Sequence, residues 1–197
     1  MSDLRIKSIF GKWVDALGDS KGRLYVNSLG NLKVIKDSKT LAAAGNYTAN
    51  DVLSENATVG TPWRFKNISK NDGRGFRINT AHQIWSKSGG ITAITPRTTL
   101  FLFSQLPTSE LRDNEANTAV LYADKGNYLR RIDFPALSNL GGSPETICTP
   151  STYGGLPLDI TLAAGLTDIY GILVIVDAET NEATSTVVDI TLAVEQF

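Results

Sequence analysis

Short segments with strand-like patterns recur about every ten residues from Tyr47 to the end of this 197-residue chain. Residues 63–68 and most of 76–85 alternate apolar with polar side chains, as strands with one buried face do. Residues 99–103 are nearly all apolar, which indicates a strand covered on both faces. Further strands are expected at 119–123, 128–134, 158–162, 169–176 and 187–194, with one helical turn at 107–111 and a long loop at 138–155.

The number of these segments limits the fold. About eight or nine strands with almost no helical periodicity predict an all-β protein, built as an antiparallel β-sandwich of jelly-roll-like type. Because no helices alternate with the strands, a parallel sheet with crossover helices is disfavoured. The chain also lacks a repeat of the length found in propellers and solenoids.

The first 45 residues differ from the rest, because they are polar, rich in Lys and Gly, and only weakly periodic. We expect residues 1–45 to form an extended N-terminal arm or a hairpin, and residues 46–197 to form the sandwich. Strand-like patterns at 23–26 and 32–35 leave open that this part adds edge strands to the sandwich. Phe10 and Trp13 have little local core to bury them, so they are predicted to anchor the arm on a partner or on its own domain.

Charge is divided along the chain. All nineteen basic residues lie within 1–131, beside eleven acidic ones, whereas residues 132–197 hold nine acidic residues and no basic one. Opposite surfaces of this kind can bind copies of the same chain, which favours an assembly protein over an enzyme or a nucleic-acid binder. The alternative is that the two parts interleave in the fold and pair their charges internally.

The chain offers few residues for catalysis. His82 is the only histidine and lies in a predicted strand without a nucleophile motif, and Cys148 is the only cysteine. We therefore predict no catalytic, cofactor-binding or metal-binding residues, with a hydrolase on a β scaffold as a minor alternative. The N-terminus lacks the apolar core of a signal peptide, and no run reaches the ~18 apolar residues of a membrane span.

Basic and aromatic residues interleave between positions 60 and 100. That pattern is compatible with stacking of single-stranded nucleic acid on a basic sheet, but alternation places the aromatics inside and the basic groups outside. We therefore expect a positive outer face that contacts an acidic protein neighbour and does not bind nucleic acid directly. Together with Tyr153 of the long loop, the predicted contact residues are Arg64, Lys66, Arg74 and Arg77.

An ordered series of short motifs resembles one known family. Residues 47–53 (Tyr-Thr-Ala-Asn-Asp-Val-Leu) are similar to a Tyr-x-Ala-(Gly/Asn)-Asp-Val segment of small structural proteins of tailed bacteriophages. An Arg-Phe-x-Asn-Ile strand at 64–68 follows. Then come residues 100–103 before Pro107-Thr108, then Asp113-Asn114, and finally 170–174 before a last strand closing at Glu195-Gln196. Spanning about residues 23–197, the series resembles the head decoration, or cement, proteins of these phages.

The resemblance implies a jelly-roll sandwich on the exterior of the virion capsid, made in the host bacterial cytoplasm. Such proteins commonly form homotrimers that bridge neighbouring major capsid protein subunits, and they carry no catalytic residues. One alternative is a tail or fibre module that binds host glycans, for which Trp63, Trp85 and Tyr153 would supply stacking surfaces. A connector module is a second structural alternative.

Overall fold

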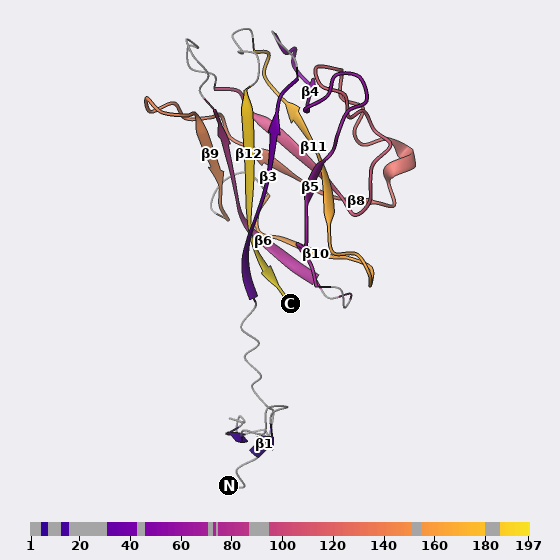
Figure 1. Ribbon diagram of the computed structural model, residues 1–197, viewed down its shortest axis with the longest axis vertical. Helices are drawn as coiled ribbons and strands as arrows, with labels where there is room; N and C mark the ends of the chain where they lie inside the picture. The colour runs from indigo at the N-terminus through magenta and orange to yellow at the C-terminus, as the bar shows by residue number, and fades with distance from the viewer. Residues whose placement is uncertain are drawn as a thin grey trace. The chain divides into compact units, whose positions relative to one another are not determined.

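The computed structural model describes residues 5–7, 13–15, 31–42, 46–70, 73, 75–86, 95–150, 155–179 and 186–197 (Figure 1). The chain divides into two compact units, Met1–Gly30 and Asn31–Phe197. In the first unit, β1 (Arg5–Lys7) pairs antiparallel with β2 (Trp13–Asp15). The second unit is a β-sandwich of two antiparallel sheets.

The two sheets are named after their strands β12 and β11. In the β12 sheet the order is β3–β12–β6, and both β9 and β10 pair with the other side of β6. In the β11 sheet the order is β8–β7–β11, and both β4 and β5 pair with the other side of β11. The strands are β3 (Asn31–Thr40), β4 (Val52–Leu53), β5 (Trp63–Phe65), β6 (Gly75–Trp85), β7 (Thr98–Phe103), β8 (Tyr128–Phe134), β9 (Glu145–Cys148), β10 (Leu158–Thr161), β11 (Ile169–Ile175) and β12 (Val187–Gln196).

The path of the chain through these sheets is that of a jelly roll. The chain crosses between the sheets after β3, β5, β6, β8, β10 and β11, and the last strand, β12, inserts between β3 and β6. This order places strands distant in sequence side by side in both sheets, as two Greek keys do. The expected all-β, jelly-roll-like sandwich is confirmed.

The core lies between the sheets and follows from the period-two pattern of the strands. Along β12, inward residues are buried and outward ones are partly exposed, in strict alternation. Aromatic side chains supply much of the buried volume, and burial of each contributes on the order of 2–3 kcal/mol. The largest fully buried side chains of the core include Trp63, Trp85, Phe65, Phe76, Leu100 and Leu102.

Residues 31–42 belong to the sandwich. Strand β3 pairs with β12 along its whole length, from Asn31 opposite Gln196 to Thr40 opposite Val187. Ile35 and Leu41 are buried in the core. Strand β3 therefore forms an edge of the β12 sheet, and the two compact units divide after Gly30, whereas the sequence led us to expect a division after residue 45.

Two local expectations between β7 and β8 are wrong. Residues 107–111 form no helical turn, and residues 119–123 form no strand. A single 3₁₀ turn, η1 (Tyr122–Asp124), is found instead. Many backbone N–H groups of this segment bond to side-chain oxygens rather than to a neighbouring strand, as described next.

Candidate interaction surface

A long connection, residues 104–127, covers the outer face of the β11 sheet (Figure 1). That face is too apolar to be left in water, because Phe103, Ile172 and Val174 of neighbouring strands are all nearly inaccessible. Leu111 and Ala119 of the connection pack against them. We call residues 104–127 the cover loop, and its first function is to bury this second apolar cluster.

Asp124 holds the two ends of the cover loop together. Its Oδ1 accepts hydrogen bonds from the backbone N and the Oγ1 of Thr108, both at 2.8 Å. Its Oδ2 accepts from the backbone N of Ser109 at 2.9 Å and from its Oγ at 2.6 Å. Burial alone raises the pKa of Asp124, but these four bonds outweigh burial and hold the pKa below its ordinary value. The carboxylate is therefore charged and fully used in fixing the loop.

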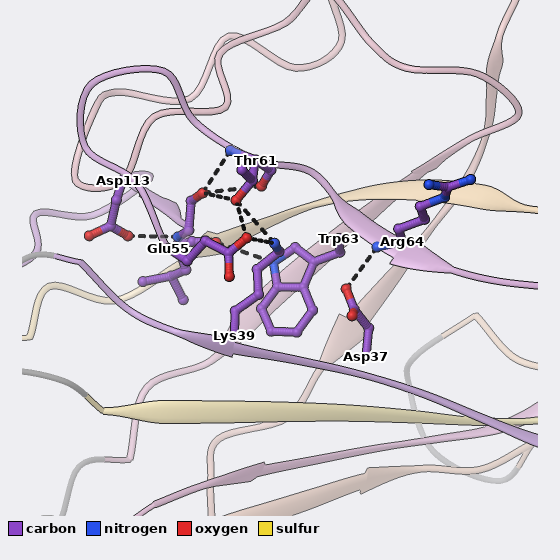
Figure 2. A network of polar contacts seen from close by, with 9 residues as sticks. Asp37, Lys39, Glu55, Thr61, Trp63, Arg64 and Asp113 are labelled. Carbon is purple, nitrogen blue, oxygen red and sulfur yellow. Dashed lines mark hydrogen bonds and ion pairs between the residues drawn. The ribbon is translucent and has the colours of Figure 1, made fainter.

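Asp113 fixes the middle of the cover loop to the strand β4 region. Its Oδ1 accepts from the backbone N of Ser54 at 2.6 Å, and its Oδ2 accepts from the hydroxyl of Tyr47 at 2.9 Å (Figure 2 labels Asp113). Gly60 has a φ of +74°, and a Cβ there would collide with the backbone of Leu111. The cover loop thus rests directly on residues 54–61.

The fixed cover loop presents apolar side chains to solvent. The Tyr122 side chain is 80% exposed, and the Nζ of Lys125 lies 3.6 Å from its ring centroid. Leu106 is 57% exposed, and Val120 and Leu121 are exposed to a smaller extent. An aromatic ring held on a rigid element and flanked by aliphatic side chains is typical of the anchors of protein interfaces. We call Leu106, Val120, Leu121 and Tyr122 the apolar tip.

A shallow groove of about 220 Å³ lies beside Leu106 of the apolar tip. Leu106 and Tyr170 contribute to its lining, together with the β10–β11 connection around Asp168. Two of the lining residues contact Arg64, because its guanidinium bonds Asp168 at 2.8 Å and lies 5.7 Å from the Tyr170 ring centroid. The polar groups of Asp168 are already occupied by Arg64, Asn67 and Thr167.

A second polar network closes the edge of the sandwich between β3 and β5 (Figure 2). The buried Nζ of Lys39 bonds the Oε1 of Glu55 at 3.0 Å and the Oγ1 of Thr61 at 3.1 Å. It also lies 5.8 Å from the ring centroid of Trp63, within range of a cation–π contact. Next to it, the backbone N of Arg64 donates to Asp37 at 2.8 Å. All these groups satisfy one another, so the network serves the fold.

Of the basic residues predicted as contacts, the structure describes Arg64, Lys66 and Arg77. Arg77 pairs with Asp159 at 2.7 Å, and Arg64 pairs with Asp168 as described. Lys66 is exposed. Phe10, Arg74 and Tyr153 lie outside the described residues, and of Trp13 only the backbone in β2 is described.

Basic residues from the first part of the sequence form ion pairs with acidic residues from the last part within one chain. Four acidic residues after position 131 pair with basic residues of the first part in this way, because the jelly-roll order interleaves early and late strands. Besides the two pairs above, Lys36 meets Asp189 and Arg97 meets Asp177, both at 2.6 Å. The internal-pairing alternative is therefore correct for these residues, and oppositely charged surfaces no longer argue for self-assembly.

The structure also places the other candidate residues. Trp63 and Trp85 are each 1% exposed, so neither can stack on a sugar or a nucleotide base. His82 contacts Glu145 at 2.9 Å on an outer face. Burial raises the pKa of the Cys148 thiol to about 11, and the thiol donates to the backbone O of Asp133. Among the described residues, no three His, Cys, Asp or Glu side chains lie close enough to share a metal ion.

Sequence reasoning missed the cover loop as a unit. A usable signal was present, because Thr108-Ser109 supplies paired backbone and hydroxyl donors and Asp124 is an acidic residue flanked by a turn. Such donors and acceptors meet only when the chain doubles back over fifteen residues, which local patterns do not reveal.

No helix in the part of the chain described is long and apolar enough to cross a membrane.

No family model matches the chain, and no curated protein matches it. Among solved structures, it is similar to the decameric capsid protein of BFDV, with 14% identity over 83% of this chain and 96% of that chain and a TM-score of 0.30. It is also similar to a chain of the Israeli acute paralysis virus full particle, with 10% identity over 91% of this chain and 75% of that chain and a TM-score of 0.31. A third similar structure is a family 35 carbohydrate-binding module from an environmental isolate. It has 16% identity over 82% of this chain and 87% of that chain, with a TM-score of 0.27. TM-scores of this size do not establish a shared fold, so the jelly-roll assignment rests on the strand order.

Proposed function

We propose that this protein is a bacteriophage structural protein that decorates the capsid and stabilises it by bridging neighbouring major capsid protein subunits. The observation that carries the proposal is the apolar tip, which Asp124 holds rigidly although Tyr122 itself is 80% exposed. The ordered motifs that resemble decoration proteins support it, and the jelly-roll fold is common among capsid proteins. Fold alone does not decide the function, because lectin domains share it.

The mechanism of stabilisation is binding linked to assembly. A protein that binds the completed lattice but not its free subunits shifts the equilibrium towards the lattice by mass action. Bridging several subunits adds avidity, so each individual contact can be weak. In this mechanism Tyr122 and its neighbours fill a depression on the shell, and the rigid cover loop reduces the entropy lost on binding.

Apolar contacts, not charge, supply the affinity in this proposal. The guanidinium groups of Arg64 and Arg77 are occupied within the chain, whereas Lys66 and Lys125 are exposed. Shell binding should therefore change little between low and physiological salt. Further contacts through the predicted arm residues Phe10 and Trp13, and through Arg74 and Tyr153, remain part of the proposal, as does a homotrimer on the virion.

Co-sedimentation with purified shells that lack this protein tests the proposal. Wild-type protein should bind at a defined stoichiometry, and Tyr122→Ser should weaken binding by about tenfold or more. Leu32→Ser is the matched control, because Leu32 is 76% exposed on β3 of the opposite sheet. Removal of residues 1–22 measures the contribution of the arm separately. Absence of binding to shells, or equal affinity of the two serine variants, would overturn the proposal or the assignment of the tip.

A further inference from the structure

We propose that Ser109 is a positioning residue, which sets the direction of the Tyr122 side chain without touching a partner itself. Its effect on shell binding rests on the proposed function, whereas its effect on the apolar tip is measured on the free protein. Ser109 lies in the first half of the cover loop and Tyr122 in the second half. Because Ser109 is only 3% exposed, it acts on the surface through its hydrogen bonds.

The Ser109 hydroxyl joins a carboxylate to the backbone of the tip. Its Oγ donates to the Oδ2 of Asp124 at 2.6 Å, and the same oxygen accepts from the backbone N of Leu121 at 3.2 Å. The backbone N of Asp124 in turn donates to the carbonyl O of Leu121 at 3.0 Å. These three hydrogen bonds form a closed cycle through Ser109, Asp124 and Leu121, which we call the Ser109 cycle.

Tyr122 lies between the two backbone positions that the Ser109 cycle fixes. It follows Leu121, whose N–H and C=O are both used in the cycle, and it is the first residue of η1, which ends at Asp124. The other bond of this turn, from the backbone N of Lys125 to the O of Tyr122, is 3.4 Å long. That exceeds the about 2.7–3.2 Å of ordinary N–H···O bonds. The Ser109 cycle is therefore the main constraint on the backbone that carries the Tyr122 ring.

A hydroxyl is suited to this position because it can donate one hydrogen bond while it accepts another. The bond to the Asp124 carboxylate is charge-assisted and short, and it increases the electron density on Oγ. Such polarisation strengthens the second bond of the chain, which Oγ accepts from Leu121. Without this oxygen, the N–H of the 39% exposed Leu121 would turn to water and the turn would lose one of its attachments.

The contact between Lys125 and Tyr122 reports whether the tip is ordered. The Nζ of Lys125 lies 3.6 Å from the centroid of the Tyr122 ring. Protons held over the face of an aromatic ring have chemical shifts displaced upfield, so the ε-methylene protons of Lys125 should show this displacement. A tip that samples several conformations must be ordered when it binds, which lowers affinity. Loss of the displacement and loss of affinity should therefore occur together.

NMR of the purified full chain with Ser109→Ala tests the inference. The amide of Leu121 should exchange about tenfold or more faster, because two bonds of the cycle are lost, and the Lys125 shifts should move towards those of an unstructured chain. Thr118→Ala is the matched control, since Thr118 Oγ1 also accepts a backbone N–H of the cover loop, that of Glu110 at 2.7 Å, but lies outside the cycle. The Asn117 amide, which bonds the O of Asn50 at 2.9 Å, is the internal control for general loosening of the loop.

Co-sedimentation with shells measures the consequence for binding. Ser109→Ala should weaken binding about fivefold, and Thr118→Ala should leave it unchanged. Ser109→Cys, of nearly the same size but a weaker donor and acceptor, should give an intermediate effect on both measurements, and it replaces the alanine variant if circular dichroism shows that variant to be unfolded.

Three results decide the matter. Unchanged Leu121 exchange and Lys125 shifts, or equal acceleration at Leu121 and Asn117, would overturn the positioning role. Altered NMR signals with wild-type affinity would overturn the link between an ordered tip and binding. Shells that do not bind the wild-type protein would overturn the capsid proposal alone, because the NMR measurement still decides the role of Ser109.

Discussion

Replacing Asp124 by Ala should destabilise the protein far more than loss of a surface carboxylate. The change removes the acceptor of four hydrogen bonds, two of which come from Ser109, a residue that is only 3% exposed. Each buried donor left without an acceptor costs about 1–3 kcal/mol. Thr108 is exposed and can turn its donors to water. The two donors of Ser109 therefore set the expected loss at about 2–6 kcal/mol.

Urea unfolding followed by tryptophan fluorescence measures this loss. Asp159→Ala is the control, because Asp159 pairs with Arg77 but its side chain is 63% exposed, so its removal should cost less than about 1 kcal/mol. Hydrogen exchange of residues 104–127 shows whether the cover loop opens locally before the sandwich unfolds. Equal unfolding free energies for the two variants, with unchanged exchange in the cover loop, would refute the assigned role of Asp124.

Three further predictions concern other groups. Glu55→Gln should lower the unfolding free energy by about 1–3 kcal/mol, because it leaves the buried ammonium of Lys39 without its partner. Lys39→Met should lower it by less than about 1 kcal/mol, because the carboxylate of Glu55 that remains is partly exposed. Chemical denaturation of both variants measures the difference. The hydrogen bond from Arg112 lowers the pKa of Glu110 to about 2, so the stability due to this pair is complete above pH 4.5 and is lost as the pH falls towards 2. Comparing the unfolding free energy of Glu110→Gln with that of wild type across that range measures it, and a constant difference would contradict it. In the native state Cys148 should react with iodoacetamide at least about a hundredfold more slowly than a free thiol, because burial raises its pKa to about 11 and leaves the residue 0% exposed. In urea it should react at the rate of a free thiol.

The strands of the sandwich were predictable because period-two patterns report burial directly. Residues 76–85 and 187–194 alternate in the sequence, and the corresponding strands β6 and β12 alternate between buried and partly exposed side chains. The jelly-roll order was predictable only as a class, since strand spacing indicates a sandwich without saying which strands are neighbours. The placement of β3 was ambiguous for the same reason, because an edge strand with exposed Leu32 and Val34 has a weak pattern.

The candidate surface was not predictable, because its determinants are non-local. The ion pairs of Arg64 with Asp168 and of Arg77 with Asp159 join residues that are 104 and 82 positions apart. A sequence that separates its charges along the chain therefore gives a folded surface on which they are paired. In the same way, 119–123 looks like a strand by composition, but Asp124 and Ser109 draw it into a turn. In this segment, hydrogen bonds between side chains and the backbone replace the strand-to-strand backbone hydrogen bonds that the sequence pattern predicted.

The two outer faces of the sandwich differ in polarity, and therefore in whether they can be left in contact with water. On the β11 sheet, Phe103, Ile172 and Val174 make the outer face another core, so the cover loop is required for stability. On the β12 sheet, paired charges keep the outer face compatible with water. Tyr122 is different from both, because its ring buries almost no part of itself against the cluster beneath the loop. Burial of the cluster does not account for the 80% exposed ring, and the proposed contact with a capsid depends on this ring.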